Sequence, residues 1–136
     1  MFRLTLVTIA ITIAGIACHK SQDNNNHPIS KSLLRTWIFT EQKIGIGGPG
    51  QWTAVNPPNQ SLRFNADSTL TTSVTIFTGI HNYTVIDSVS LKLTPASNNN
   101  SISVMRYSID TLKGILELTP TVPLCIEGCS YRFKAQ

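Results

Sequence analysis

Cys125 and Cys129 are the two side chains best placed to react with each other. They stand in the segment PLCIEGCSYRF, where Gly128 directly before the second cysteine permits a tight turn. Such a turn brings two Cα atoms within the roughly 4.4–6.8 Å that a disulfide requires. Half of a zinc site is the alternative, but the three histidines of the chain offer no paired ligand spacing. The spacing therefore favours a disulfide and predicts no metal site.

The third cysteine, Cys18, lies where an apolar segment ends and a polar one begins. Arg3 followed by the apolar run 4–17 has the pattern of a secretory signal peptide. This run is shorter than the about 20 residues needed to span a hydrocarbon core. Residues 1–17 are therefore expected to be removed.

The four residues that end at Cys18, Gly-Ile-Ala-Cys, resemble the lipobox of bacterial lipoproteins, with Gly15 in place of the usual Leu. In those proteins the cysteine is acylated and becomes the new N-terminus. The resemblance implies a lipid anchor at Cys18, and an incidental cysteine after an ordinary signal peptide is the alternative. The polar residues that follow read as a flexible tether, so residues 18–28 link the acylated cysteine to a domain at 29–136. An exported domain meets an oxidising compartment, which supports the disulfide.

Charge and motifs argue against several classes of function. The formal net charge is +4, but Lys and Arg are dispersed without a run, so no nucleic-acid partner is expected. The domain has one histidine, His81, and the chain lacks the Ser-hydrolase, zinc-protease, phosphate-loop and dinucleotide motifs. We expect neither catalytic residues nor a cofactor, and hence no enzyme.

Short alternating segments dominate residues 29–136 and predict antiparallel strands. Residues 69–77 alternate Leu70, Thr72, Val74 and Ile76 with polar residues, which is the period of a half-buried strand. Turn-forming residues separate most of the other predicted strands, at 35–44, 51–55, 61–64, 81–86, 90–94, 101–109, 114–119 and 130–134. Eight or nine such strands form a sandwich or an up-and-down barrel. Residues 29–35 invite a short helical turn whose leucines plug one end.

Two features of this pattern have competing interpretations. In 101–109 the apolar residues change parity at Met105, which indicates either a β-bulge or an exposed patch of Met105, Tyr107 and Ile109 for a partner protein. The turn residues Asp67, Asp87 and Asp110 each precede Ser or Thr. They either cap backbone amides or belong to three-residue O-glycosylation sequons like those of Bacteroidetes.

The order LLRTW, a meander of short strands and a closing CIEGCSYRF resembles the small lipocalin-like lipoproteins of Bacteroidetes over residues 33–134. Arg35 stands where that family usually has Gly. The resemblance implies an eight-stranded up-and-down barrel whose first-strand Trp closes the base beneath a last-strand arginine. Trp37 matches the first position and Arg132 is the candidate for the second, although alternation in SYRFK directs Arg132 outward.

Lipocalin-like barrels are expected to bind a small apolar or amphipathic ligand at the open end, and Trp37, Phe39 and Tyr83 are the predicted wall residues. A core role is the alternative for Trp37. Seventeen large apolar residues on the inward faces favour a filled barrel with a small cavity at most. A filled barrel points instead to an accessory protein that meets another envelope protein. In either case we expect an exported, outer-membrane-anchored lipoprotein, facing the periplasm or the cell surface, with the acyl chains at Cys18 in the membrane.

Overall fold

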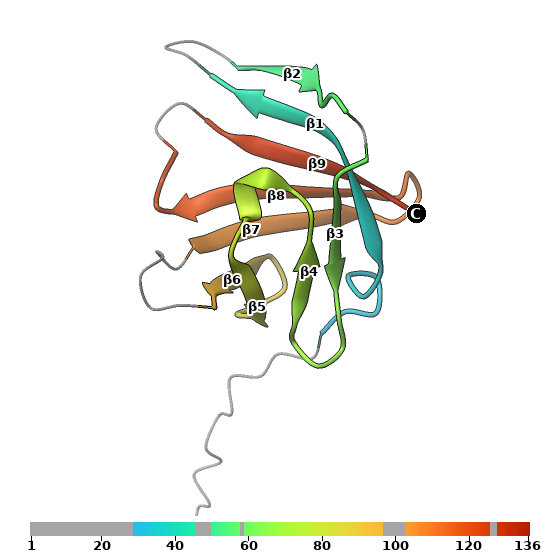
Figure 1. Cartoon of the computed structure of the whole chain (residues 1–136), viewed down its shortest axis with the longest axis vertical. Helices are drawn as coiled ribbons and strands as arrows, with labels where there is room; N and C mark the ends of the chain where they lie inside the picture. The colour runs from blue at the N-terminus through green and yellow to red at the C-terminus, as the bar shows by residue number, and fades with distance from the viewer. Residues whose placement is uncertain (1–28, 46–49, 58, 97–102, 126–127) are drawn as a thin grey trace, which may run out of the picture.

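The computed structural model describes residues 29–45, 50–57, 59–96, 103–125 and 128–136. The expected signal peptide, Cys18 and the tether lie outside these residues. Within them the chain is almost entirely β-structure (Figure 1). The strands are β1 (Thr36–Ile44), β2 (Gln51–Ala54), β3 (Ser61–Phe64), β4 (Leu70–Thr72), β5 (Ile80–Val85), β6 (Ser90–Pro95), β7 (Ser103–Asp110), β8 (Ile115–Val122) and β9 (Ser130–Ala135). A single 3₁₀ turn, η1 (Thr75–Phe77), is described between β4 and β5.

Eight of the strands form a nearly closed antiparallel barrel. Their order is β4-β3-β1-β9-β8-β7-β6-β5, so the last strand returns to pair with the first. A bridge between Thr69 and Asn82 joins the two ends of the sheet, and beside it the Tyr83 N–H donates to the Ser68 carbonyl at 2.9 Å. The short β2 pairs with the second half of β1, off this path. The up-and-down barrel is therefore confirmed, and the sandwich is excluded.

Inward-facing apolar side chains fill most of the barrel. Alternate residues of each strand are buried, as period two predicts, and they form one core: Leu33, Trp37, Phe39, Leu62, Phe64, Leu70, Val74, Phe77, Tyr83, Val85, Leu91, Leu93, Met105, Tyr107, Leu116, Leu118 and Phe133. The aromatic rings interlock in stacked and edge-to-face pairs, such as Phe39 on Phe133 at 5.0 Å and Phe64 against Tyr83 at 4.9 Å.

One end of the barrel is closed by the segment that precedes β1, and we call it the plugged end. Residues 29–35 form a tight turn in which the Leu33 N–H donates to the Ser30 carbonyl at 2.9 Å. The Leu33 side chain is fully buried, and its carbonyl accepts the indole N–H of Trp37 at 3.1 Å. The opposite end, where β6 and β8 finish and β7 and β9 begin, is the mouth.

The prediction of one long strand at 69–77 is wrong. β4 ends at Thr72, whose hydroxyl accepts the N–H of Val74 at 3.0 Å and thereby competes with the strand ladder. The chain then enters η1, which breaks the alternation. Val74 and Phe77 are buried, whereas Ile76, expected on the inward face, is 46% exposed.

The parity change in β7 is a β-bulge. The register with β8 shifts between Val104 and Met105. Beyond the shift, Met105 and Tyr107 face inward and are buried. The bulge is confirmed, and the alternative of an exposed partner patch at these residues is wrong.

Aspartates cap the three turns at the plugged end. The Asp67 carboxylate accepts the N–H and hydroxyl of Thr69 at 3.0 and 2.6 Å, and Asp110 accepts the N–H of Lys113 at 3.0 Å. Asp87 binds the amide two residues ahead in the same way. The hydrogen bonds from Thr69 hold the pKa of Asp67 below its usual value, and that from the Lys113 amide does so for Asp110. These residues therefore cap backbone groups, which is the first of the two interpretations of their sequence pattern.

Candidate functional site

An apolar pocket of about 270 Å³ lies at the mouth of the barrel. Its floor consists of the buried side chains of Phe77, Leu93 and Met105, from η1, β6 and β7. Its remaining walls are supplied by Ile76, Ile80, Ser103, Pro120, Pro123, Leu124, Cys125, Cys129 and Tyr131. None of these described lining residues carries a charge, so the pocket suits an uncharged, mainly apolar group.

The 3₁₀ turn η1 positions one side of the pocket. It turns Phe77 into the barrel, where its ring meets Tyr131 edge-to-face with centroids 5.8 Å apart. The same turn places Ile76 on the rim. Because η1 spans the mouth instead of continuing β4, it narrows the opening and leaves a small pocket above a packed core.

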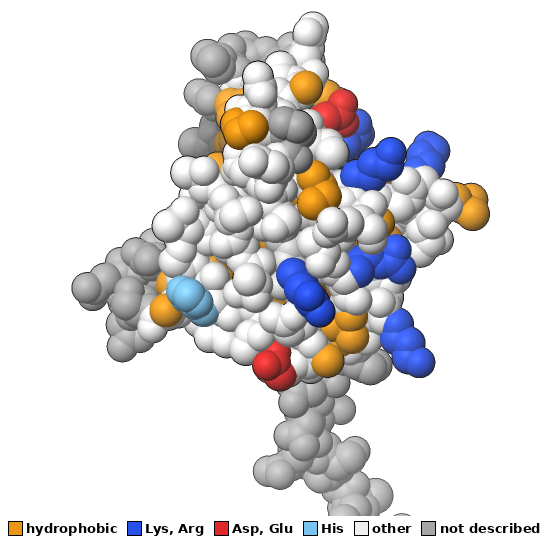
Figure 2. All heavy atoms as spheres, turned by 45° about the vertical axis from the view of Figure 1, so that its right-hand side comes forward, with side chains coloured by type: hydrophobic (Ala, Val, Ile, Leu, Met, Phe, Trp, Pro, Cys, Tyr) orange, Lys and Arg blue, Asp and Glu red, His pale blue; other side chains and the backbone are white. Residues whose placement is uncertain are grey.

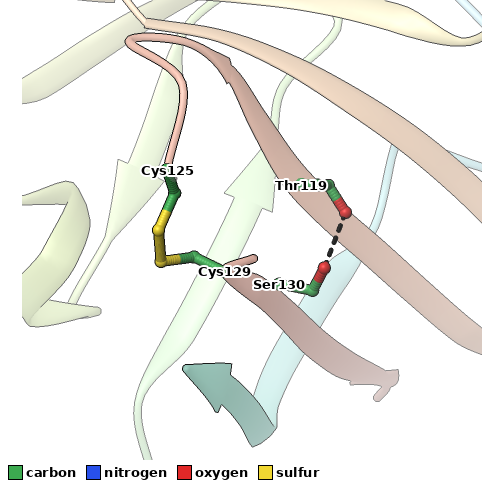
Figure 3. Close-up of a disulfide and its surroundings, with 4 residues drawn as sticks. All are labelled: Thr119, Cys125, Cys129 and Ser130. Atoms are coloured by element: carbon green, nitrogen blue, oxygen red, sulfur yellow. Dashed lines mark hydrogen bonds between the residues drawn. A yellow bond between two sulfur atoms is a disulfide. The ribbon is translucent and has the colours of Figure 1, made fainter. Parts of the chain in front are cut away.

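The Cys125–Cys129 disulfide forms the opposite wall and confirms the prediction (Figure 3). The two Cα atoms are 5.6 Å apart. The turn depends on Gly128, whose φ of +72° suits glycine and whose N–H donates to the Cys125 carbonyl at 3.0 Å. Ser130, the first residue of β9, shares a 2.8 Å hydrogen bond with the hydroxyl of Thr119 on β8. The bridge is therefore held against the barrel by both strands that flank it.

Tyr131 and Ser103 give the pocket its polar side chains. Tyr131 is partly buried between Phe39 and Phe77, and desolvation raises the pKa of its phenol. The phenol is therefore neutral at physiological pH and offers a hydrogen-bond donor within an apolar wall. The Tyr131 phenol can therefore orient a bound molecule through a hydrogen bond, and that molecule need not carry a charge.

The three predicted wall residues lie in the core, and none of them lines this pocket. Trp37 is fully buried at the plugged end, which agrees with its alternative role as a core residue. Tyr83 is buried, and its hydroxyl donates to the Asn65 carbonyl at 2.7 Å. Phe39 is buried below the pocket against Tyr131 and Phe133.

The residues that form the rim were missed because they lie outside the strands. Leu124 is 70% exposed and directly precedes the disulfide, and Ile76 belongs to η1. The sequence signal for Leu124 was the segment PTVPLC, in which an apolar side chain lies between a proline and a cysteine, whereas the alternating pattern of 69–77 gave no signal for the rim position of Ile76.

Arg132 does not contact the first-strand tryptophan, so the role implied by the family resemblance is wrong. As alternation predicted, it points outward, where its guanidinium lies 3.7 Å from the ring centroid of Trp52 on β2. Its Nε–H donates to Glu117 at 3.1 Å, and a second nitrogen lies 3.5 Å from Glu41. Trp37 instead has Arg35 over its ring, at 5.6 Å. Arg132 therefore fastens β2 to the outside of the barrel.

The part of the chain that the structure describes offers neither a metal site nor a membrane-spanning helix. There, no three His, Cys, Asp or Glu residues lie close enough to hold a metal ion. No helix among the described residues is long and apolar enough to cross a membrane. Comparisons with protein-family models, curated proteins and solved structures gave no match.

Proposed function

We propose that this chain is a lipid-anchored envelope lipoprotein that holds a small apolar or amphipathic ligand at the mouth of its barrel. The observation that carries this proposal is the apolar pocket of about 270 Å³ lined by Phe77, Met105 and Leu124. Eight-stranded barrels are just wide enough to hold one small ligand. The acylated Cys18 and the tether, expected from the sequence, would keep the pocket close to a membrane.

The size and lining of the pocket restrict the ligand. Its volume falls slightly below the roughly 300–1,000 Å³ of sites for drug-sized molecules. The apolar part of the ligand lies against Phe77 and Met105, and one uncharged polar group meets the Tyr131 phenol. A compound larger than the pocket volume of about 270 Å³ is not fully enclosed and would extend through the mouth into water.

A fluorescence titration with N-phenyl-1-naphthylamine, an apolar probe that brightens on leaving water, tests the pocket. Leu124→Asp places a charge on the rim and is expected to weaken probe binding about tenfold, which corresponds to about 1.4 kcal/mol. Leu112→Asp is the matched control, because Leu112 is also exposed but lies at the plugged end. Absence of probe binding, or equal weakening by the two substitutions, contradicts the proposal.

Lipid attachment is tested separately by feeding the producing bacteria radioactive palmitate. The parent chain is expected to be labelled, and Cys18→Ser is expected to abolish the label. An unlabelled parent chain removes the anchor from the proposal and leaves the pocket to be judged on its own titration.

The packed interior favours a second candidate function. Among the described residues, one continuous core of buried apolar side chains fills the barrel up to the floor of the pocket. An accessory protein of an envelope complex needs no ligand and is consistent with such an interior. Native mass spectrometry of the chain purified from its own host distinguishes the two functions, because a bound small molecule supports the first and a co-purifying protein without one supports the second.

A further inference from the structure

Basic side chains gather along one side of the plugged end. Arg63 on β3 pairs with the start of β1. Lys134 on β9 lies opposite Ile38 of β1 on one side and Ile115 of β8 on the other. These two basic residues therefore come from strands that neighbour β1. Figure 2 shows Lys and Arg side chains collected over the right-hand part of the molecule. We define the basic arc as five exposed residues: Lys31, Arg35, Arg63, Lys113 and Lys134.

An apolar tip projects beside this arc. Leu112, in the β7–β8 turn, is 98% exposed, the highest value among the exposed large hydrophobic residues described. Hydrogen bonds define the turn: Asp110 accepts the N–H groups of Leu112 and Lys113, and the Gly114 carbonyl accepts the N–H of Ala135 at 2.8 Å. Leu112 is therefore exposed to water next to Lys113. Contact with an apolar phase would remove the unfavourable free energy of hydrating this side chain.

Acidic side chains at this end do not cancel the arc. Asp110 lies 3.6 Å from Lys113 and offsets that one cation. Asp67 lies in the β3–β4 turn, four residues after Arg63, and therefore at that end of the arc, whereas Asp87 belongs to the β5–β6 turn, away from β1, β9 and β8. The five cations of the arc outnumber Asp110 and Asp67, so this side of the plugged end keeps a net positive charge that attracts an anionic surface.

The preceding chain joins the domain at the same end. Ile29 is the first described residue and packs against the core beside the plug. The 28 residues before it, with the apolar run 4–17 and Cys18, are covalently attached here. A membrane attachment at Cys18, as proposed, would therefore reach the domain at the plugged end and not at the mouth.

We propose that the basic arc and Leu112 form a docking surface for an anionic phospholipid bilayer. The cations meet the lipid phosphates, Leu112 enters the interface, and the mouth faces away from the bilayer. This inference rests on the membrane attachment in the proposed function but does not depend on the pocket. It implies that the pocket exchanges its ligand with the aqueous side and not directly with the bilayer beneath it.

Depth-dependent quenching on vesicles tests this orientation in the full chain. Leu112→Trp introduces a probe at the tip, and Val122→Trp, at a residue 54% exposed near the mouth, is the matched control. Each variant is reconstituted on vesicles of phosphatidylcholine and phosphatidylglycerol in equal parts, with and without brominated lipid. Signal from Trp37 and Trp52 is removed by subtracting the parent chain. We expect brominated lipid to quench the Leu112→Trp signal at least about twofold and to leave the Val122→Trp signal unchanged.

The electrostatic part is tested by removing charges. Lys31→Gln, Lys113→Gln and Lys134→Gln together are expected to abolish quenching at the tip. The control removes three cations elsewhere, through Lys43→Gln, Lys92→Gln and Arg106→Gln, and is expected to retain it. Urea unfolding of each variant verifies that the barrel is intact.

Several outcomes overturn the proposal. Quenching of Val122→Trp alone places the mouth on the lipid, and quenching of neither leaves the domain standing off on its tether. Equal quenching of both shows that the domain takes no fixed orientation. A concentration-dependent change in the Leu112→Trp emission without vesicles shows that a second copy covers the tip. These readouts are independent of the probe titration. Palmitate labelling distinguishes failure of the anchor from failure of the docking surface, because a labelled chain without quenching at Leu112→Trp refutes the docking surface alone.

Discussion

Truncation of the plug tests whether the closed end stabilises the barrel. Leu33 is fully buried beneath Trp37, and Leu33→Ala removes three carbon atoms from that contact. Buried Leu→Ala substitutions cost about 2–5 kcal/mol, and the larger values occur where the surroundings cannot collapse into the cavity. Collapse is restricted here because the backbone of Leu33 is hydrogen-bonded to Ser30, Arg35 and Trp37. We therefore expect a loss of about 3 kcal/mol in the free energy of unfolding.

Urea unfolding followed by far-ultraviolet circular dichroism measures this loss. A decrease of that size lowers Tm by about 12–24 °C in a domain of roughly a hundred residues. Leu112→Ala is the matched control, because the same atoms are removed from a side chain that is 98% exposed, and its effect should stay within about 0.5 kcal/mol. If Leu33→Ala also stays within about 0.5 kcal/mol of the parent, Leu33 does not plug a packed core and the reasoning fails.

Two further predictions concern side chains with polar partners. Arg132→Met removes the stack on Trp52 and both ion pairs; because the guanidinium is partly exposed, the loss should be about 1–2 kcal/mol. In a double-mutant cycle with Trp52→Ala, zero coupling would contradict the contact. Burial raises the pKa of Tyr83 and Tyr131. Above about pH 10 the unfolded chain therefore releases phenol protons that the folded chain keeps, so unfolding free energy should fall as pH rises through the folded-state pKa values. Tyr131→Phe should reduce this decrease of the unfolding free energy with pH. A decrease that is unchanged by the substitution would argue against a buried phenol.

Most of the barrel was predictable because its information is local. Alternation identified 61–64 with the bounds observed for β3, and it placed Tyr131, Arg132 and Phe133 of β9 on the correct faces. Turn residues marked the reversals, and the glycine before Cys129 marked the disulfide turn. Each of these signals depends on residues within a few positions of one another, so no knowledge of long-range pairing was needed.

The candidate site was less predictable because alternation separates inside from outside but carries no information on depth along the barrel axis. Trp37 and Met105 both point inward, yet Trp37 pairs with Leu62 near the plug, whereas Met105 lies at the floor of the mouth pocket. Depth is set by the register between strands, and here a bulge in β7 and the early end of β4 alter that register. Alternation therefore showed that Trp37 points inward but not that it lies at the plugged end, away from the lining of the pocket.

Arg132 stacks on Trp52, and Arg35 lies over Trp37, which differs from the pairing in the family pattern. This difference follows from the same limitation. Parity directed Arg132 outward, so its aromatic partner had to lie outside the barrel, and a residue buried in the base did not meet that condition. Trp52 meets this condition because β2 pairs with the second half of β1 and places Trp52 opposite Lys43. On the other side of β1, β9 places Arg132 opposite Glu41, two residues earlier along the strand. Arg35 then occupies the space over Trp37 at the plugged end. A stacked arginine at each end of β1 thus follows from side-chain parity combined with strand register, and the family pattern of one last-strand arginine on the first-strand tryptophan does not hold in this chain.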